Sequence, residues 1–488
     1  MGAVKDVSGQ LFIKGQWVDA KSGKTFPVKN PATGEQVATV ADGGAEDARS
    51  AISAAHEAFK SWSRLSPVER SRYLEKAFKL MSDRRDDIAH LITVENGKPV
   101  EEAKKEVGFA VGYLDWFAGE ARRIYGEIIP SPITARRLWM VRQPVGVVAA
   151  ITPWNFPATM ITRKIAPALA AGCTVVLKPA EQTPLSAFAI AKIFQDVGLP
   201  AGVLNVVSNL YPEEIGEEFL KNPLVRKVAF TGSTEVGKLL MRGAADQLKR
   251  VSFELGGNAP FIVFEDADFD AAVEGAVGIK YLRVAGQSCI CANRIYVQQG
   301  IADRFSKAFT EKVKAIKVGS GFESGVIVGP LINTETLDKV DRLIQDAVKH
   351  GAKVAAGGRP LKEGAFAKGN FYAPTVLLNV SDDMAVCREE AFGPVAPILS
   401  FQTEQEVIER ANDTTYGLAS YLFTKDMGRV FRIAEALEYG LVGVNDAAGY
   451  AHETPFGGFK ESGLGREGGK EGVDAYMEVK SIVVNVPR

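Results

Sequence analysis

Short apolar segments alternate with amphipathic ones through the middle of this chain, and this alternation constrains the fold more than any other feature. Apolar segments that end in polar or glycine-containing turns recur at 145–153, 173–181, 202–208, 225–232 and 250–257. Stretches with apolar residues at helical spacing separate them, at 159–171, 185–197, 212–220 and 234–246. Strands buried on both faces are continuous apolar runs, and helices between parallel strands cover the sheet. The pattern predicts a doubly wound α/β domain.

A second alternation follows the first. Strand-like segments occur at 259–264, 294–298, 395–401, 419–424 and 441–445. The helical segments between them are 268–283, 301–316, 333–350, 404–412 and 427–437. A chain of 488 residues is too long for one ordinary hydrophobic core. We therefore expect a second α/β domain.

Residues 44–120 precede both alternations and have apolar residues at helical spacing. Ser66, Pro67 and Glu69 indicate a helix start, because the Glu follows the Ser by three residues and Pro is favoured in the first turn. Two strand-like segments, 136–144 and 481–486, have no obvious partner in either domain. We expect them to pair with each other or with another subunit.

The composition excludes several classes of protein. A formal net charge of −1 gives no long-range attraction to nucleic acid or anionic lipid. No apolar run has the length of a membrane helix, and the N-terminal MGAVKDVSGQ lacks a signal-peptide pattern. We therefore expect a cytoplasmic protein that binds neither nucleic acid nor a membrane. Cys289 and Cys291 are close together, but C-x-C without a nearby Cys or His pair is poor zinc spacing, so we expect no metal.

Unusual residues follow the predicted strands at their carboxyl ends, where open α/β sheets bind ligands. Gly232 and Gly237 flank a strand-to-helix turn that fits either a phosphate site or a simple helix cap. Lys178 and Glu181 fit either contacts to ribose hydroxyls or a surface ion pair.

Three further residues have side chains suited to chemistry at a carbonyl. Glu254 follows a strand, where a partly buried carboxyl can act as a general base. Asn155 lies between two prolines and offers a fixed N–H donor for an oxyanion. Cys289, in GQSCICANR, is a nucleophile if its thiol ionises. Each also has an ordinary interpretation, respectively a surface acid, an Asn turn and a small buried hydrophobe, and the residues alone leave these open.

The order and spacing of the motifs resemble the aldehyde dehydrogenase superfamily. The motifs are ITPWNFP, KPAEQTP, FTGSTEVG, FELGGNAP, GQSCICANR, EEAFGPV and PFGGFKESGLGREGG. The resemblance implies a Rossmann-type dinucleotide domain, an α/β catalytic domain and a bridging β-arm. The implied boundaries are 1–123 with 145–254, then 255–469, and 124–144 with 470–488 for the arm. An arm of this kind implies a homo-oligomer, either a dimer or a tetramer.

The resemblance also assigns roles to the candidate residues. Cys289 would attack an aldehyde and carry it as a thiohemiacetal and then a thioester. Asn155 would hold the oxyanion together with the backbone N–H of Cys289, and Glu254 would activate the water that releases the acid. The implied contacts to a nicotinamide dinucleotide are Thr152, Pro153, Trp154, Lys178, Glu181, Gly232, Ser233, Glu390 and Phe392.

The cofactor preference follows from the implied position of Glu181 near the adenosine 2′-hydroxyl. A carboxylate accepts a hydrogen bond from a hydroxyl but repels a 2′-phosphate. We therefore expect NAD to be preferred, while Lys178 keeps NADP use possible.

Within the superfamily the sequence resembles the succinate-semialdehyde dehydrogenases in segments such as WFAGEARRIYGEIIPS and MITRKIAPALAAGC. In that group two arginines hold the substrate carboxylate, and they match Arg163 and Arg283 here. Arginine suits this role because it donates two parallel hydrogen bonds. The sequence departs from the group before PFGG, where Tyr450, Ala451 and His452 replace serines.

Because of this departure, Tyr450 or His452 would replace the serine that contacts the substrate in that group, or the site would bind a different anion. Succinate semialdehyde is the expected substrate, and glutarate semialdehyde, 2-oxoglutarate semialdehyde and sulfolactaldehyde remain alternatives. A non-catalytic structural relative is a further alternative, but it would be expected to lack Cys289, Glu254 or Asn155.

Cys291 has two interpretations. It is either a small residue that packs behind the active loop or a redox partner that forms a strained, easily reduced disulfide with Cys289.

Overall fold

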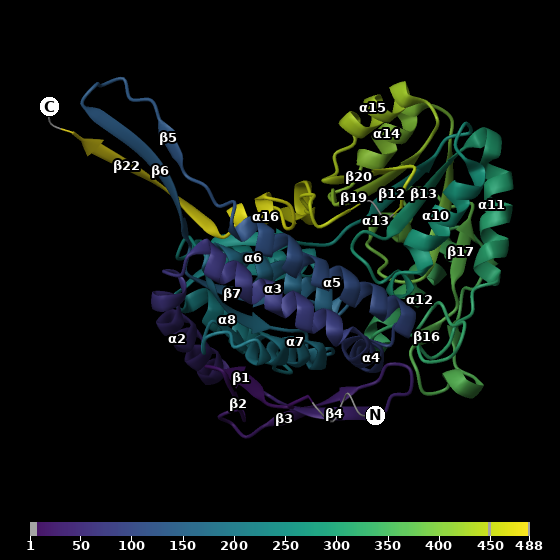
Figure 1. The fold of residues 1–488 in the computed structure, drawn as a ribbon. Coiled ribbons are helices and arrows are strands. Elements are labelled where there is room, and N and C mark those ends of the chain that lie inside the picture. The colour runs from purple at the N-terminus through teal and green to yellow at the C-terminus, as the bar shows by residue number, and fades with distance from the viewer. Residues whose placement is uncertain (1–6, 448–449, 487–488) are drawn as a thin grey trace.

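The structure is a computed structural model that describes residues 7–447 and 450–486. Two α/β bodies lie side by side, and a narrow β-arm projects from the first (Figure 1). The expectation that the N-terminus carries no targeting signal concerns in part residues 1–6, which lie outside the described residues. No helix within the described ranges is both long and apolar enough to cross a membrane.

The first body is built around an eight-stranded sheet with the order β2-β1-β9-β8-β7-β10-β11-β21. Its central strands, from β9 to β11, are parallel, as the alternation predicted. The strands are β1 (Leu11–Ile13), β2 (Gln16–Val18), β7 (Val147–Ile151), β8 (Thr174–Lys178), β9 (Leu204–Val206), β10 (Val225–Thr231), β11 (Arg250–Glu254) and β21 (Gly463–Leu464). The N-terminal strands β1 and β2 add antiparallel to one edge.

Helices cover both faces of this sheet and bury two clusters of apolar side chains against it. The helices are α2 (Ala45–Trp62), α3 (Pro67–Asp83), α4 (Arg85–Asn96), α5 (Val100–Ala121), α6 (Pro157–Ala171), α7 (Pro184–Asp196), α8 (Glu213–Lys221) and α9 (Thr234–Ala245). The helical spacing in 44–120 and between the strands thus predicted their positions correctly.

The strand order of the first sheet reverses between β7 and β10. The chain passes from β7 to β8 and β9 on one side, then returns to place β10 and β11 on the other. The turns after β7 and β10 therefore open a crevice at their carboxyl ends, which is where doubly wound sheets bind ligands.

The second body contains a seven-stranded sheet with the order β14-β17-β18-β13-β12-β19-β20. All its strands are parallel except β14 at one edge. The strands are β12 (Ala259–Val263), β13 (Ala292–Gln298), β14 (Lys353–Ala356), β17 (Thr375–Leu378), β18 (Val395–Phe401), β19 (Ala419–Phe423) and β20 (Leu441–Val444).

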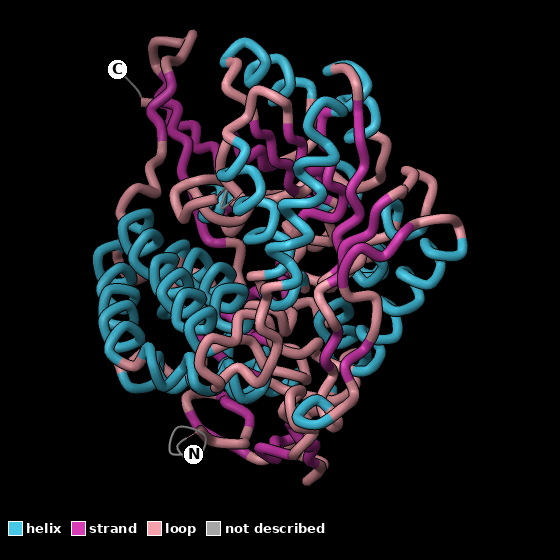
Figure 2. Tube along the Cα trace, turned by 90° about the vertical axis from the view of Figure 1, so that its right-hand side faces the viewer, coloured by secondary structure: helices cyan, strands magenta, loops and turns pink. Residues whose placement is uncertain are grey.

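Helices lie on either side of the strands of the second sheet (Figure 2). They are α10 (Phe269–Tyr281), α11 (Gln299–Lys314), α12 (Thr334–Lys349), α13 (Ala385–Arg388), α14 (Glu404–Asn412) and α15 (Met427–Ala436). The core is continuous, and Cys289 is one of its buried residues. The predicted second α/β domain is therefore present.

Three strands form the arm, which begins beside the short helix α16 (Glu471–Asp474). These strands are β5 (Glu127–Ile129), β6 (Arg136–Pro144) and β22 (Met477–Asn485). β22 pairs antiparallel with β6 along its whole length, from Met477 opposite Pro144 to Asn485 opposite Arg136. The two strands without predicted partners thus pair with each other.

Several short elements were not predicted. Small hairpins are formed by β3 (Thr25–Lys29) with β4 (Gln36–Ala41), and by β15 (Pro360–Leu361) with β16 (Phe371–Tyr372). β21 comes from the segment 255–469 yet pairs with β11 at the edge of the first sheet. The domain boundaries inferred from the resemblance stay a prediction.

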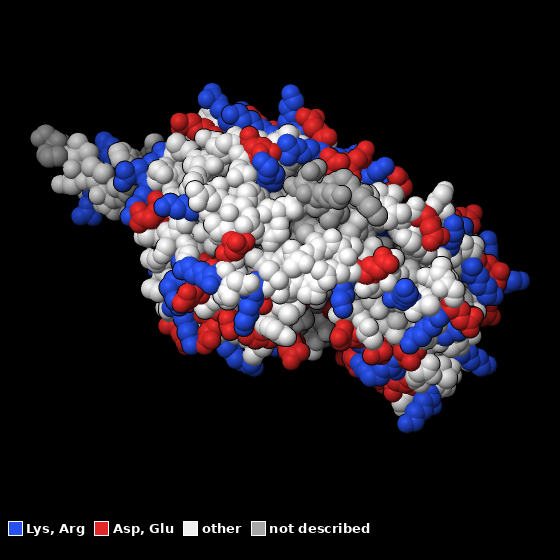
Figure 3. Space-filling view, turned by 90° about the horizontal axis from the view of Figure 1, so that it is seen from below, with Lys and Arg blue, Asp and Glu red and all other residues white. Residues whose placement is uncertain are grey.

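Charged side chains of both signs are interspersed over the face seen from below, around a broad uncharged area (Figure 3). This face has no large patch of a single sign, in keeping with the net charge of −1.

The capping box at the start of α3 gives a stability prediction. Ser66 Oγ accepts a hydrogen bond from the Glu69 N–H at 3.3 Å, and the Glu69 carboxylate accepts from the Ser66 N–H at 2.7 Å. Replacing Ser66 with Ala should cost about 1 kcal/mol of stability. We expect thermal unfolding by circular dichroism to shift down by about 1–2 °C.

Ser82→Ala is the matched control, because Ser82 lies in the last turn of the same helix and donates to the Phe78 carbonyl. That change should alter stability by less than about 0.5 kcal/mol. Equal effects of both substitutions would contradict the capping role of Ser66.

Candidate functional site

Cys289 lies in a tight turn between the 3-10 turn η1 (Val284–Gly286) and β13. Val284, Ala285 and Gly286 have φ of 47°, 54° and 79°. Left-handed backbone costs energy in a non-glycine residue, most of all in a β-branched one, so this turn is strained. Gln287 holds it, because its Nε2 donates to the Val284 carbonyl at 2.8 Å and its Oε1 accepts from the Ile332 N–H at 2.9 Å.

The loop between the two sheets lies directly on this turn. A Cβ atom on Gly257 would lie 2.1 Å from the carbonyl oxygen of Cys289, so only glycine allows this approach. The side chain of Cys289 is buried, with 9% of its surface exposed. The turn after β11 and the turn before β13 therefore meet at the candidate nucleophile.

Glu254 ends β11 and is buried beside Cys289. Its Oε2 accepts a hydrogen bond from Arg163 Nη2 at 3.2 Å, whereas its Oε1 is buried and has no hydrogen-bond partner among the described residues. Burial raises the pKa of Glu254, although the charge of Arg163 acts in the opposite direction. A carboxylate with a raised pKa and one unused oxygen is suited to accept a proton.

The Cys289 thiol and Glu254 affect each other. Burial, followed by the charge of Glu254, raises the pKa of Cys289 well above its usual value, while Arg163 lowers it. The sulfur therefore holds its proton in this arrangement, and Glu254 is the neighbouring group able to receive it.

Asn155 is held in one orientation in the turn after β7. Its Oδ1 accepts from the Phe156 N–H at 3.0 Å, so its Nδ2 faces the Cys289 turn and donates to the Gln287 carbonyl at 3.1 Å. An amide nitrogen has two hydrogens, and the second is left for a substrate oxygen. This geometry fits the predicted role as oxyanion donor.

A buried ion pair fixes the backbone of the Asn155 turn. Lys98 Nζ pairs with Glu106 and donates to the Asn155 carbonyl at 2.7 Å. Glu106 Oε1 also accepts from the Ala158 N–H at 2.9 Å, at the start of α6. Sequence reasoning missed both residues, because nothing local in the sequence shows that α5 packs on this turn.

Arg163 lies in a buried cluster of charges next to Glu254. Its guanidinium is buried and lies between two carboxylates, with Nη2 3.2 Å from Glu254 Oε2 and Nε 2.6 Å from Glu467 Oε2. Lys164 pairs with the same Glu467. The charge of Arg163 lowers the pKa of both Glu254 and Cys289, and its contact with a substrate carboxylate stays a prediction. Glu467 was missed, because it is distant in sequence.

A cavity of about 240 Å³ opens beside Cys289 at the crevice between β7 and β10. Its lining combines predicted catalytic and cofactor residues, namely Pro153, Trp154, Asn155, Gly232, Ser233, Glu254, Cys289, Glu390 and Phe392. The Phe392 ring stands edge-on to Trp154, with 5.5 Å between ring centroids. Thr336 and Lys339 of α12 also line it and were not predicted.

The remaining cofactor candidates lie at neighbouring strand ends. Lys178 is buried at the end of β8, and its Nζ lies 3.5 Å from Glu181 Oε2. Thr152 Oγ1 is buried without a hydrogen-bond partner in the described part of the chain. A Cβ on Gly232 would lie 2.3 Å from the Phe230 ring, so glycine is required here. Ser233 follows as the N-cap of α9. An anionic ligand fits such a helix start.

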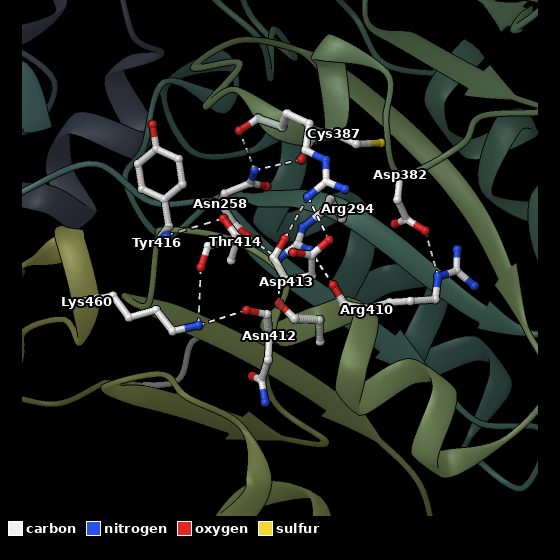
Figure 4. Close-up of polar contacts among 12 residues, drawn as sticks. Asn258, Arg294, Asp382, Cys387, Arg410, Asn412, Asp413, Thr414, Tyr416 and Lys460 are labelled. Carbon is white, nitrogen blue, oxygen red and sulfur yellow. Dashed lines mark hydrogen bonds and ion pairs between the residues drawn. The ribbon is translucent and has the colours of Figure 1, made fainter.

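Glu390 connects the two bodies at this cavity. Its Oε1 accepts from the Gly257 N–H at 2.9 Å, and burial raises its pKa to about 7. The segment before Glu390 is anchored by Asn258, whose Nδ2 donates to the Cys387 carbonyl at 2.8 Å (Figure 4). Arg294 donates to the Asn258 carbonyl at 3.0 Å, which ties β13 to the same anchor.

A larger cavity of about 390 Å³ lies on the other side of the Asn155 turn, lined by Phe156 and Thr159. Arg283 and Tyr450 face each other in it, and Arg283 Nη1 donates to the Tyr450 hydroxyl at 3.0 Å. His452 instead bonds the Phe109 carbonyl through Nε2 at 2.8 Å. Of the two candidates for the missing serine, Tyr450 is thus the one that lines the cavity.

Cys291 is buried two residues from Cys289, and its thiol lies 3.6 Å from the Lys280 carbonyl. Burial raises its pKa, which disfavours the thiolate needed for disulfide exchange. This setting favours the packing interpretation, and the redox role stays a prediction. The described residues contain no cluster of three or more His, Cys, Asp or Glu that would hold a metal ion.

The sequence matches the aldehyde dehydrogenase family over residues 17–482. It is 52% identical to a glutarate-semialdehyde dehydrogenase of Pseudomonas putida, over 98% of both chains. It is 50% identical to an NADP(+) succinate-semialdehyde dehydrogenase of Escherichia coli, again over 98% of both. A 3-sulfolactaldehyde dehydrogenase of Pseudomonas putida is 51% identical, over 97% of this chain and 96% of that one.

Among solved structures, betaine aldehyde dehydrogenase from Staphylococcus aureus in complex with NAD+ superposes with a TM-score of 0.97. The two chains are 39% identical, over 100% of this chain and 98% of that one. The chain is therefore an enzyme of the aldehyde dehydrogenase family. The predicted fold class and the predicted family are confirmed.

The proximity of Glu254 to Cys289 gives a testable prediction about the thiol. Glu254→Gln removes the negative charge that raises the pKa of Cys289 and leaves the positive charge of Arg163. The pKa of Cys289 should therefore fall, and the thiolate should appear at lower pH than in the parent enzyme. The measurement is the pH dependence of alkylation by iodoacetamide, with Cys289→Ser as the background.

Glu390→Gln is the control for this prediction, because the charge of Glu390 also raises the pKa of Cys289, but less than the charge of Glu254 does. Its alkylation profile should shift much less. An unchanged or higher pKa in Glu254→Gln would show that Glu254 does not act on the thiol.

Proposed function

We propose that this enzyme oxidises a short aldehyde with an anionic tail to the corresponding acid, with succinate semialdehyde as the first substrate to test. The observation that carries the proposal is the cavity in which Arg283 and Tyr450 face each other, beside the turn that carries Asn155. Of the two arginines predicted to hold the tail, Arg283 is the one that lines this cavity, whereas Arg163 pairs with Glu254 and Glu467.

The catalytic residues divide the reaction into two steps. Cys289 transfers its proton to Glu254, and its sulfur adds to the aldehyde carbon while Asn155 Nδ2 holds the oxygen anion. When bound, a nicotinamide dinucleotide supplies the hydride acceptor that leaves the acyl group on sulfur as a thioester. Glu254 passes the Cys289 proton to solvent and then takes a proton from water, and the water oxygen attacks the acyl carbon. The carbon–sulfur bond breaks, the acid leaves and the sulfur recovers a proton from Glu254.

The cofactor proposal rests on the crevice between β7 and β10. Thr152, Gly232, Ser233 and the start of α9 provide polar groups and free space for a pyrophosphate. Lys178 and Glu181 would contact the adenosine ribose, and Glu390 the nicotinamide ribose. The relatives include an NADP(+) enzyme and an NAD+ complex, and we propose NAD as the preferred cofactor with NADP also used.

Substitution of Glu181 tests the cofactor preference. The Glu181 carboxylate should repel the additional phosphate of NADP, so Glu181→Gln should raise the kcat/KM ratio of NADP to NAD by about tenfold. Steady-state rates with both cofactors measure this ratio. Glu213→Gln is the control, since Glu213 also acts on Lys178 but lies at the start of α8. Parent activity with NADP exceeding that with NAD would contradict the proposal.

Substitution of Arg283 tests the proposed function itself. NADH absorbance is followed with succinate semialdehyde and with butanal, its neutral counterpart. Arg283→Ala should reduce kcat/KM for succinate semialdehyde by about 100-fold, the effect of losing a charge-assisted hydrogen bond, and change butanal little.

Equal losses with the two aldehydes would refute the anion-binding role of Arg283. Glutarate semialdehyde, 2-oxoglutarate semialdehyde and sulfolactaldehyde belong in the same assay, because each has an anionic tail. Absence of any NADH formation would instead favour a non-catalytic relative.

A homo-oligomer, dimer or tetramer, completes the proposal. The arm carries apolar side chains that are unusually exposed for a β-sheet: Ile128 is 81% exposed, Val479 65% and Val483 58%. Exposed apolar groups on a projecting sheet are expected at an interface. A second copy of the chain is the partner that we propose for this surface.

A further inference from the structure

Glu102 lies in the first turn of α5 and lines the same 390 Å³ cavity as Arg283 and Tyr450. Its Oε1 accepts a hydrogen bond from the Val284 N–H at 2.8 Å, at the start of the turn that leads to Cys289. Its Oε2 is buried and has no hydrogen-bond partner among the residues that the structure describes. The neighbouring Glu101, by contrast, is exposed and pairs with Lys104.

The charged groups around Glu102 include Lys105, which lines the same cavity from α5, and three groups that are engaged by other partners. Lys98, in the loop before α5, is bound by Glu106 and the Asn155 carbonyl. Glu106, one turn further along α5, adds a second negative charge to the surroundings of Glu102. Arg283, from the segment after α10, donates to Tyr450. None of these contacts reaches the free Oε2.

An anionic tail bound at Arg283 would therefore share its cavity with a second carboxylate. Two negative charges in a partly buried cavity repel each other strongly. A proton on Oε2 reverses this effect, because a carboxylic acid can donate a hydrogen bond to the tail.

We propose that Glu102 is a specificity-determining residue that takes up a proton when an anionic aldehyde binds. The inference rests on the proposed function and adds the proton as a requirement of tail binding. No proton is needed for a neutral aldehyde, so Glu102 couples substrate charge to pH. The proton comes from solvent and returns to solvent when the product leaves.

Burial raises the pKa of Glu102 to about 7, against the charge of Lys98 and the Val284 hydrogen bond, which lower it. The free enzyme therefore holds this proton below about pH 7 and loses it above. Binding of an anionic tail above that pH must recapture the proton, so affinity for such tails falls as pH rises. The ionisation of the tail itself does not change across this range.

The test compares kcat/KM for succinate semialdehyde and butanal in the cofactor-saturated enzyme from about pH 6 to about pH 9. Both aldehydes need Cys289, so their ratio cancels the titration of the thiol. In the parent enzyme the ratio should fall above about pH 7, approaching tenfold per pH unit for one proton. Glu102→Gln cannot ionise and should make the ratio independent of pH.

Glu101→Gln is the matched control, because it removes the adjacent exposed carboxylate. Its ratio should follow the parent profile. A flat parent profile, or an unchanged slope in Glu102→Gln, would overturn the inference. Arg283→Ala separates the two proposals. If this variant reduces kcat/KM equally for succinate semialdehyde and butanal, the proposed function is refuted, whatever the pH profile of Glu102→Gln.

Calorimetry gives a readout that does not depend on turnover. Succinate semialdehyde is titrated into the NAD-loaded Cys289→Ala enzyme at about pH 8, in two buffers that differ in ionisation enthalpy. We expect the Cys289→Ala enzyme to take up close to one proton per site, and the Cys289→Ala, Glu102→Gln double variant to take up none. Equal heats in the two buffers for the Cys289→Ala enzyme would mean that no proton is taken up, and would overturn the inference.

Discussion

The backbone of Gly257 lies so close to the carbonyl oxygen of Cys289 that a methyl side chain at position 257 would clash with that oxygen and push the two segments apart. Gly257 lies between β11 of the first sheet and β12 of the second. The same residue donates its N–H to Glu390, so one peptide unit positions the nucleophile turn and a cofactor candidate together. The relative placement of Cys289, Glu254 and Glu390 therefore depends on this contact, and neither body alone would assemble the site.

Buried charge organises the rest of the site. Glu467 is shared by Arg163 and Lys164, and although burial alone would raise its pKa, those two cations lower it. Glu254 receives only one hydrogen bond from this cluster, so its pKa is raised instead. Two buried carboxylates thus have opposite properties because the cations are divided unequally between them. The raised pKa suits Glu254 to act as a base beside the Cys289 thiol.

Most of the fold could be predicted from the sequence, because short apolar runs that end in turns alternate with longer stretches of helical spacing. The strands ended earlier than the apolar runs suggested: the residues after Ile151, Lys178 and Glu254 turn away to line the site. The motifs predicted Cys289, Glu254 and Asn155 as catalytic residues, and the structure brings all three to one cavity. The ion pairs of Arg163 with Glu254 and Glu467 were not predicted, because a long-range ion pair leaves no local pattern in a single sequence.

The pairing of β6 with β22 has a consequence for how this chain is made. β6 leaves the ribosome early, whereas β22 ends only at Asn485, and β21 and Glu467 also come late. During most of synthesis β6 lacks this partner strand, and an open strand edge of that kind invites pairing with other chains. A chain that stopped before β21 would therefore leave this edge of β6 open and would also lack Glu467, the partner of Arg163.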